Sequence, residues 1–115
     1  MRRGEIWTVA GAGDYAGKPR PAVIVQDDSF SESGSVTICG FTSDETEAPL
    51  FRILVEPNER NGLRGPSRLM ADKITTVARQ RLGHRIGQLD TGDMVRLDRA
   101  MLVFLGLAGS PRQKD

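Results

Sequence analysis

Histidine and cysteine are almost absent from this chain, which has one of each in 115 residues. The single cysteine, Cys39, excludes an internal disulfide and is typical of proteins from a reducing compartment. The single histidine, His84, excludes a catalytic pair of histidines, and the two residues together cannot supply a zinc site of nitrogen and sulfur ligands within one chain. His84 stands between Gly83 and Arg85, a sequence that favours an exposed turn over a catalytic position.

Long hydrophobic runs are also missing. The most apolar stretch, residues 101–108, is far shorter than the ~20 residues that a membrane span needs. The first residues lead into a strand-like pattern and not into the apolar segment of a secretory signal peptide. We therefore expect a cytoplasmic protein without a membrane partner.

The chain has little net charge, formally +1, so a general electrostatic attraction to nucleic acid is not expected. Its basic residues are nevertheless unusual in kind, because lysine occurs only at positions 18, 73 and 114 and the other 13 of 16 are arginine. Arginine is the better bidentate partner for phosphates and carboxylates. A GC-rich coding sequence would produce the same bias, so the arginine content alone does not decide the ligand.

Several familiar sites are excluded by their motifs, since the chain has no Walker loop, nucleophile elbow or HExxH helix. Two acidic clusters, Asp27–Asp28 and residues 44–47, have the oxygen ligands that Mg²⁺ prefers. Acidic residues that neighbour one another in a loop are more often simply solvated. We expect neither a metal nor a cofactor.

The most informative segment of the chain is residues 18–26, in which one arginine stands between two prolines. Pro21 restricts Arg20 to extended geometry, and the β-branched run 22–25 that follows predicts a strand buried on both faces. Arg20 is therefore expected where a rigid core strand begins, which is a good place to fix a cation.

Short strand patterns separated by turn signals fill most of the chain, and the period becomes helical after Asp90. Strands are expected over residues 5–9, 20–26, 35–43, 51–57, 69–70, 74–77 and 85–89. The helix should begin at Asp90, be stopped by Gly109 and Pro111, and carry an apolar face of Met94, Leu97, Met101, Phe104, Leu105 and Ala108. The pattern predicts a mostly β fold, a small barrel packed by a C-terminal helix, as one domain over residues 1–109 with a disordered tail over 110–115.

Two residues at strand ends could form a site. If the strand that begins at Arg20 pairs antiparallel with the strand that ends near Thr42, the start of one lies beside the end of the other. Arg20 and Thr42 would then be neighbours at one end of the barrel. The alternative is a surface arginine and a strand-end threonine without a function.

Blocks of sequence along almost the whole chain resemble, in the same order, those of the MazF/PemK toxins. The blocks are residues 1–7, 20–26, 41–43, 71–77, 81–83 and 86–89. The resemblance implies an SH3-like barrel, a homodimer, and a sequence-specific endoribonuclease of a type II toxin–antitoxin pair that needs neither metal nor ribosome. It assigns the family's catalytic arginine and threonine to Arg20 and Thr42.

The implied reaction is attack by a ribose 2′-OH of single-stranded RNA on the adjacent phosphate, which leaves a 2′,3′-cyclic phosphate and a 5′-OH. A planar guanidinium suits the charge that develops on that phosphate, so Arg20 is expected to stabilise the transition state. Whether Arg20 also donates a proton to the leaving oxygen is left open. Thr42 would hydrogen-bond the scissile phosphate.

Further contacts are expected around this pair. Lys18 and Lys73 are candidates for RNA phosphate contacts, and Ser43 and Tyr15 for contacts with bases or backbone. The alternative is that these four are ordinary surface residues. The expected protein partner is a cognate antitoxin whose acidic, partly apolar C-terminal tail folds onto the same groove.

Two other functions fit the expected fold. A CcdB-type gyrase poison would share the fold and bind a topoisomerase without catalysis, but it does not explain an Arg20/Thr42 pair. A non-enzymatic SH3-like binding module would need an exposed aromatic groove, whereas aromatic residues make up only 5% of this chain.

Overall fold

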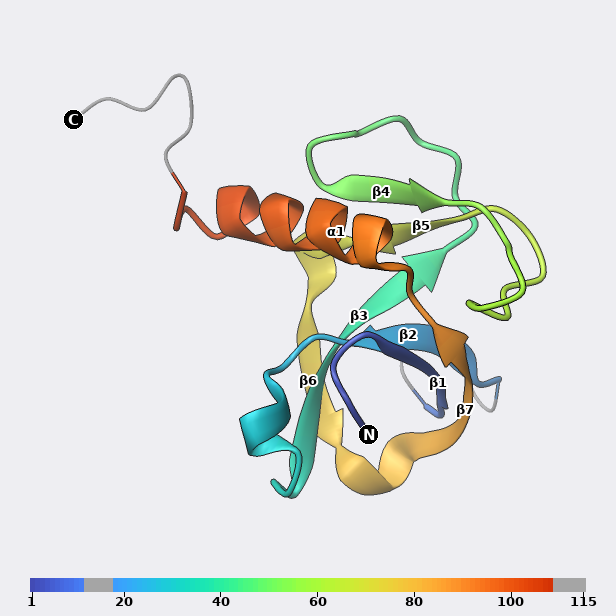
Figure 1. Cartoon of the computed structure of the whole chain (residues 1–115), viewed down its shortest axis with the longest axis vertical. Helices are drawn as coiled ribbons and strands as arrows, with labels where there is room; N and C mark the ends of the chain where they lie inside the picture. Colours follow the sequence, from blue (N-terminus) through green and yellow to red (C-terminus); the bar gives the residue numbers. More distant parts are fainter. Residues whose placement is uncertain (12–17, 109–115) are drawn as a thin grey trace.

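Antiparallel strands followed by one helix make up the protein, whose computed structural model describes residues 1–11 and 18–108 (Figure 1). The strands are β1 (Glu5–Val9), β2 (Arg20–Ile24), β3 (Ser35–Thr42), β4 (Arg52–Val55), β5 (Ser67–Met70), β6 (Thr75–Ala78) and β7 (Leu82–Gln88). Three single 3₁₀ turns, Asp28–Phe30, Ala71–Lys73 and Arg79–Arg81, interrupt the loops, and the helix α1 spans Thr91–Phe104. The mostly β fold with a C-terminal helix is thus confirmed. No helix within the described residues is long and apolar enough to cross a membrane.

The long strand β3 organises the sheet. One edge of β3 pairs with β2, while the other edge pairs first with β6 and then, at its end, with β5. The full order is β4-β5-β3-β2-β1-β7 with β6 branching from β3, and every pairing is antiparallel. The 3₁₀ turn Arg79–Arg81 leads from β6 directly into β7, so the chain wraps around without pairing these two strands. The sheet is therefore strongly bent and barrel-like but not closed.

Strand β2 is buried on both faces, as its continuous apolar run predicts. Val23, together with Val25 directly after the strand, belongs to the larger of two apolar clusters, which also contains Leu97 of α1. Ala22 and Ile24 belong to the smaller cluster on the opposite face. The start of β2, and with it Arg20, is consequently anchored to both cores of the protein.

Helix α1 packs on the larger cluster through part of its expected apolar face. Leu97 is fully buried, and Met94 and Met101 pack against the same cluster. Phe104 and Leu105 were expected in this face but are exposed, because the helix extends past the sheet (Figure 1). The ring of Phe104 lies beside that of Phe51, with 6.1 Å between the ring centroids. This part of the core prediction is wrong.

Two details of the helix ends also differ from the sequence prediction. Asp90 occupies the N-cap position, but its side chain makes no capping bond and instead accepts from Asn58 Nδ2 at 3.2 Å. The helix ends before the expected Gly109, because Gly106 adopts a positive φ of 75° and its N–H donates to Val103 O. The expected tail over residues 110–115 lies outside the described residues.

The predicted turn around His84 is wrong as well. Residues 82–88 form β7, and His84 is an exposed residue within it. The strand starts three residues earlier than the predicted 85 because Leu82 pairs with Val9 at the far end of β1. The exposure of His84 was expected. Its position in a strand could be predicted only if the length of the partner strand β1 were known.

Candidate functional site

A groove of about 690 Å³ opens where the start of β2 meets the end of β3. Its lining includes five of the six side chains that the sequence singled out: Lys18, Arg20, Thr42, Ser43 and Lys73. The sixth, Tyr15, lies outside the described residues. We refer to this site as the cationic groove, because three of those five side chains are positively charged.

The strand register explains why Arg20 and Thr42 line one groove. β2 and β3 pair antiparallel with Ala22 opposite Gly40 and Val23 opposite Cys39. Each strand continues for two residues beyond the Ala22–Gly40 pair, β2 back to Arg20 and β3 on to Thr42. The expected antiparallel arrangement is therefore present, and it brings the two strand ends together.

The hydroxyl of Thr42 has a defined orientation. The backbone N–H of Asp44 donates to Thr42 Oγ1 at 3.1 Å, so the oxygen already accepts one hydrogen bond from the protein. A hydroxyl that accepts in this way can still donate its own proton to a ligand in the groove. Thr42 is thus suited to donate to an anionic oxygen.

One carboxylate, Asp44, stands at the rim of the cationic groove. The hydroxyl and the backbone N–H of Thr46 donate to Asp44 Oδ1 at 2.8 and 3.0 Å, and these bonds lower the pKa of Asp44 below its usual value. Against this one anion stand Lys18, Arg20 and Lys73. The balance of charge favours an anionic ligand such as a phosphodiester.

A largely but not fully buried ion pair supports one wall of the groove. Arg52 of β4 donates from Nε and Nη2 to the two carboxylate oxygens of Asp72 at 2.8 and 3.1 Å. These bonds lower the pKa of Asp72 and raise that of Arg52. Asp72 lies in the 3₁₀ turn directly before Lys73, so the pair holds the turn that presents this lysine.

The apolar lining of the groove was not found by sequence reasoning. It includes Val9, Ile38 and Met70, which come from three different strands. Their apolar character predicted strands but gave no signal of a shared groove, because that depends on how β3 bends between β2 and β5. Only the charged and hydroxyl residues at strand ends carried a recognisable signal.

The acidic clusters considered as magnesium sites are engaged within the protein. Asp27 accepts from Ser29, and Asp28 accepts from the backbone N–H of Arg3 at 2.6 Å and from the Arg2 guanidinium at 3.2 Å. Within residues 1–11 and 18–108, no three His, Cys, Asp or Glu side chains gather in an arrangement that could hold a metal ion. Cys39 is buried in β3, and burial raises the pKa of its thiol to about 12, so it is not a nucleophile.

Comparison with known proteins identifies the family. The model of the PemK-like, MazF-like toxins of type II toxin–antitoxin systems matches residues 2–105. A probable endoribonuclease MazF of Mycolicibacterium smegmatis is 57% identical over 95% of this chain and 100% of that protein. The endoribonuclease MazF9 of Mycobacterium tuberculosis is 31% identical over 93% of this chain and 98% of that protein.

The solved structure of a mycobacterial endoribonuclease in complex with its cognate antitoxin has the same fold. Its TM-score is 0.77, at 21% sequence identity, over 96% of this chain and 99% of that one. The matched family model covers every strand and the helix α1. The chain therefore belongs to the PemK-like, MazF-like toxin family of type II toxin–antitoxin systems.

Proposed function

We propose that this chain is a sequence-specific endoribonuclease that cuts single-stranded RNA in the cationic groove. The observation that carries the proposal is that Arg20 and Thr42 line one groove together with Lys18 and Lys73. Further support comes from the two curated relatives, which are both named endoribonucleases. A CcdB-type poison or a non-catalytic binding module would give no reason for this set of side chains.

The proposed reaction is an intramolecular transesterification, in which the phosphate exchanges its ester bond to the 5′-oxygen for one to the 2′-oxygen. The ribose 2′-oxygen attacks the adjacent phosphorus, the bond to the 5′-oxygen breaks, and the products carry a 2′,3′-cyclic phosphate and a 5′-OH. The 2′-OH loses a proton and the leaving 5′-oxygen gains one, so the reaction is balanced without water or a metal ion. The protein has to stabilise the extra negative charge of the five-coordinate intermediate.

Arg20 is the residue proposed for that stabilisation. An arginine guanidinium carries its positive charge at all physiological pH values. It can therefore meet the developing charge with two parallel donors, whereas it is a poor base. Donation of a proton to the leaving 5′-oxygen is a second role that the same donors would allow.

Thr42 is proposed to bind a non-bridging oxygen of the scissile phosphate. Its oxygen is held by Asp44 N–H, which leaves the hydroxyl proton for the ligand. Removing one such donor typically costs about 10²–10³ in rate. Lys18 and Lys73 are proposed to bind flanking phosphates, and Ser43 and Tyr15 to contact bases or backbone.

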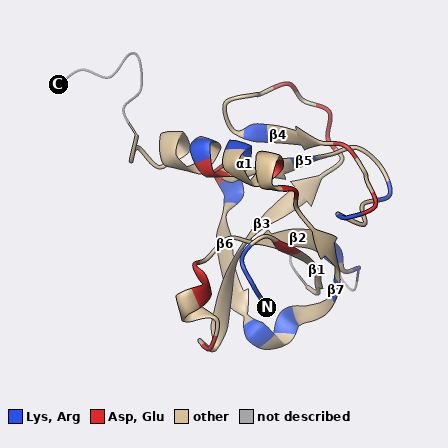
Figure 2. Ribbon diagram, in the orientation of Figure 1, with Lys and Arg blue, Asp and Glu red and all other residues tan. Residues whose placement is uncertain are grey.

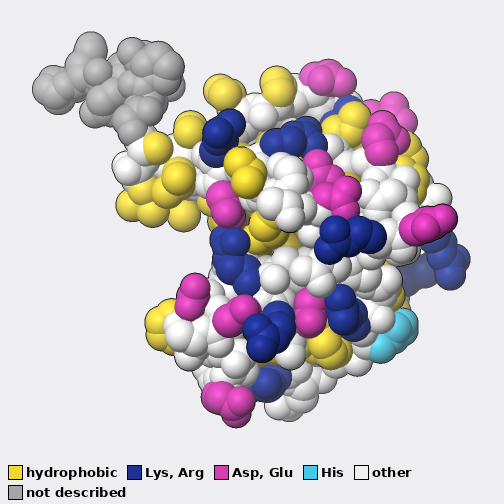
Figure 3. All heavy atoms as spheres, viewed as in Figure 1, with side chains coloured by type: hydrophobic (Ala, Val, Ile, Leu, Met, Phe, Trp, Pro, Cys, Tyr) yellow, Lys and Arg dark blue, Asp and Glu magenta, His cyan; other side chains and the backbone are white. Residues whose placement is uncertain are grey.

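We further propose that the chain acts as a homodimer. Several apolar side chains at and just after the end of α1 are exposed, namely Leu102, Val103, Phe104, Leu105 and Leu107. Figure 3 shows hydrophobic side chains gathered on the projection from which the grey terminal segment leads away. A cluster of this kind is typical of a protein–protein interface. Sedimentation of the full chain should give twice the monomer mass, and Leu105→Asp should shift it toward the monomer.

The partner proposed for the toxin is a cognate antitoxin with an acidic, partly apolar tail that blocks the cationic groove. Known neighbours of the same fold were solved together with an antitoxin. A toxin that cuts cellular RNA acts in the cytoplasm, which is the proposed location.

The decisive test uses purified, antitoxin-free protein with a long mixed-sequence RNA in EDTA, followed by mapping of the cut ends. Discrete cuts with 5′-OH ends are expected from the wild type and from Arg64→Ala, a matched control at an exposed arginine outside the groove. Arg20→Ala should abolish detectable cleavage, and Thr42→Ala should reduce it about 10²–10³-fold. Intact RNA from the folded wild type, or normal cleavage by folded Arg20→Ala, would refute the proposal.

A further inference from the structure

Among the described residues that line the cationic groove, Asp44 is the one acidic side chain. A carboxylate repels the phosphate backbone of RNA, so this residue is not suited to bind that part of the ligand. RNA also presents the edges of its bases, and a base with an exocyclic amino group offers a hydrogen-bond donor there. The chemistry of Asp44 therefore fits a base edge.

The loop that carries Asp44 is held at several points, although its side chains are exposed. The Asp44 N–H donates to Thr42 Oγ1 at 3.1 Å, and the Asp44 backbone oxygen accepts from Arg68 Nη1 at 3.5 Å. Arg68 also pairs with Glu47 at 3.3 Å, so one arginine holds the loop near both ends of its acidic run. The backbone of Asp44 is thus fixed beside the end of β3.

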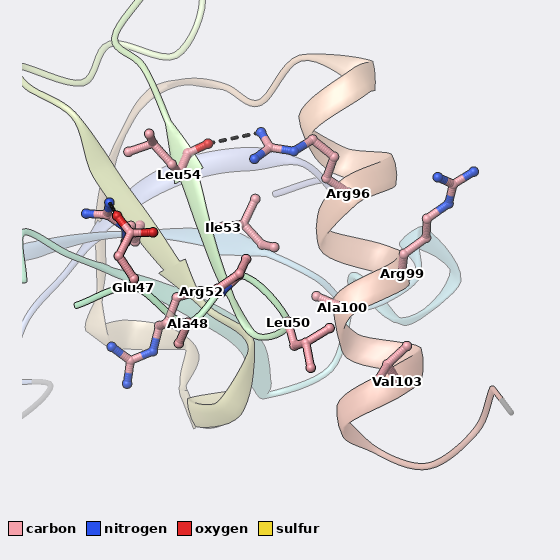
Figure 4. Close-up of a pocket in the computed structure, with 12 residues that line it drawn as sticks. Glu47, Ala48, Leu50, Arg52, Ile53, Leu54, Arg96, Arg99, Ala100 and Val103 are labelled. Atoms are coloured by element: carbon pink, nitrogen blue, oxygen red, sulfur yellow. Dashed lines mark hydrogen bonds and ion pairs between the residues drawn. The ribbon is translucent and has the colours of Figure 1, made fainter. Parts of the chain in front are cut away.

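The acidic residues of this loop, drawn in red between β3 and β4 in Figure 2, do not share one environment. Glu47 lines a separate groove of about 400 Å³ between α1 and β4, and Figure 4 shows it across that groove from Arg99. Glu45 lines neither groove. Of the three acidic residues of the loop, all within the described chain, only Asp44 lines the cationic groove.

The two carboxylate oxygens of Asp44 differ in their hydrogen bonds. Thr46 donates its hydroxyl and its backbone N–H to Oδ1, at 2.8 and 3.0 Å. Within residues 1–11 and 18–108, no group donates a hydrogen bond to Oδ2. The bonds to Oδ1 fix the orientation of the carboxylate, and Oδ2 is the oxygen that can accept from a ligand.

The apolar part of the groove offers a surface for the base itself. Val9, Ile38 and Met70 line it, and the missing side chain of Gly40 leaves room for Met70, whose Cε would lie 3.3 Å from a Cβ at that position. A thioether packs favourably against an aromatic ring, and a nucleobase has such a ring whereas a phosphate does not. The groove therefore combines a surface for the face of a base with a charged acceptor for its edge.

Two other roles for Asp44 fit less well. The hydrogen bonds from Thr46 lower the pKa of Asp44, whereas a general base for the 2′-OH works best with a pKa near the operating pH. Positioning of Thr42 uses the backbone N–H of Asp44, which almost any residue could supply. Neither role explains a carboxylate at this position.

We infer that Asp44 is a specificity-determining residue that selects a base with an exocyclic amino group next to the scissile phosphate and rejects uracil there. The inference rests on the proposed endoribonuclease function. The location follows from Thr42, because Asp44 holds the hydroxyl that is proposed to bind this phosphate. Cytosine offers its N4 amino group to Oδ2, whereas uracil places the acceptor O4 at the same point, against the negative charge.

The first test compares the cut sites of the wild type, Asp44→Asn and Glu45→Gln in a long mixed-sequence RNA in EDTA. At one position that adjoins the cut, wild-type sites should contain uracil at least about tenfold less often than cytosine. Asparagine can still accept from Thr46 and can donate its amide N–H to O4, so Asp44→Asn should admit uracil there and leave the rest of the recognition sequence unchanged. Glu45→Gln removes the same charge from the same loop outside the groove and should keep the wild-type pattern.

The second test measures RNA binding without cleavage. The probes are fluorescent 2′-O-methyl oligocytidine and oligouridine of about eight nucleotides, which lack the attacking hydroxyl. Fluorescence anisotropy should show that the wild type and Glu45→Gln bind oligocytidine about tenfold more tightly than oligouridine. In Asp44→Asn this ratio should fall below about twofold, because the amide can serve either base.

Four outcomes would overturn the inference: an unchanged cytosine-to-uracil preference in Asp44→Asn, an equal change in Glu45→Gln, no binding of either oligomer, or a uniform loss of rate at all cut sites of Asp44→Asn with the base preference kept. The last of these would show that Asp44 only positions Thr42. Selective binding of oligocytidine that depends on Asp44, in a wild type that cuts no RNA, would support the base preference and refute the proposed nuclease.

Discussion

The ion pair between Arg52 and Asp72 should be the strongest charge–charge contact of this fold, and Asp72→Asn tests it. Two hydrogen bonds of 2.8 and 3.1 Å join the side chains, of which only 13% and 16% is exposed. The amide of asparagine keeps one acceptor for Arg52 but loses the negative charge and replaces the other oxygen with a donor. A hydrogen bond to a charged group contributes roughly 1.5–3 kcal/mol, so Asp72→Asn should lower the free energy of unfolding by about 2 kcal/mol.

A matched control is available on the neighbouring strand. Arg68 pairs with Glu47, whose side chain is 82% exposed, so Glu47→Gln removes the same kind of charge from a pair whose carboxylate is solvated. Its effect on the free energy of unfolding should stay below about 0.5 kcal/mol. Both variants are compared with the wild type by urea denaturation at pH 7, with the slope m as a check that the unfolded states are alike.

The contribution of the Asp72 carboxylate to the free energy of unfolding should depend on pH in a defined direction. The pKa of Asp72 is lowered in the folded protein, so its stabilisation is fully present above the unfolded value of about 3.9 and is lost as the pH falls through the folded value. The difference between wild type and Asp72→Asn should therefore be constant near neutral pH and shrink below about pH 4. An Asp72→Asn effect no larger than that of Glu47→Gln, or one that does not shrink in acid, would refute this account.

Three further predictions concern the core. Gly87→Ala should lower the free energy of unfolding by about 3 kcal/mol in urea denaturation, because the new Cβ would collide with the backbone of the loop between β4 and β5. Gly34 has open space around it, so the control Gly34→Ala should lower the free energy of unfolding by less than about 1 kcal/mol. Leu97→Ala should cost about 3 kcal/mol or more because it leaves a cavity under α1, while Leu102→Ala at the exposed side should cost far less, and similar losses would contradict the packing described. Cys39 should resist iodoacetamide at pH 8 in the native protein, because its thiol is buried and burial raises its pKa to about 12. It should react once the protein is unfolded, and mass spectrometry would detect the added label. Rapid labelling of the native protein would contradict this prediction.

The sequence was sufficient where one local pattern decides the structure. The β-branched run after Arg20 predicted a strand buried on two faces, and Val23 and Ile24 indeed lie in different clusters. Antiparallel pairing of consecutive strands then suggested that Arg20 and Thr42 are neighbours, and both line the cationic groove. These inferences needed only the period of the pattern and the direction of the chain.

The sequence was insufficient where a residue's environment depends on another element. Phe104 has the helical spacing of a core residue, yet it is exposed because the sheet ends before the helix does. His84 has glycine and arginine neighbours typical of a turn, yet it lies in β7, because residues 82–88 pair with β1 from Glu5 to Val9.

The cationic groove is lined both by residues at the ends of core strands and by residues outside the strands. Arg20 and Thr42 are terminal residues of strands whose interiors are buried, so the two cores fix their backbone positions. Lys18 and Lys73 lie outside the strands, in the connection before β2 and in the 3₁₀ turn before β6. On the proposed function, the residues that must meet the scissile phosphate within a fraction of an ångström are those held by the sheet. The residues that meet the flanking RNA are on segments that can differ between relatives without disturbing the core, so changes in RNA preference can arise there while the chemistry stays the same.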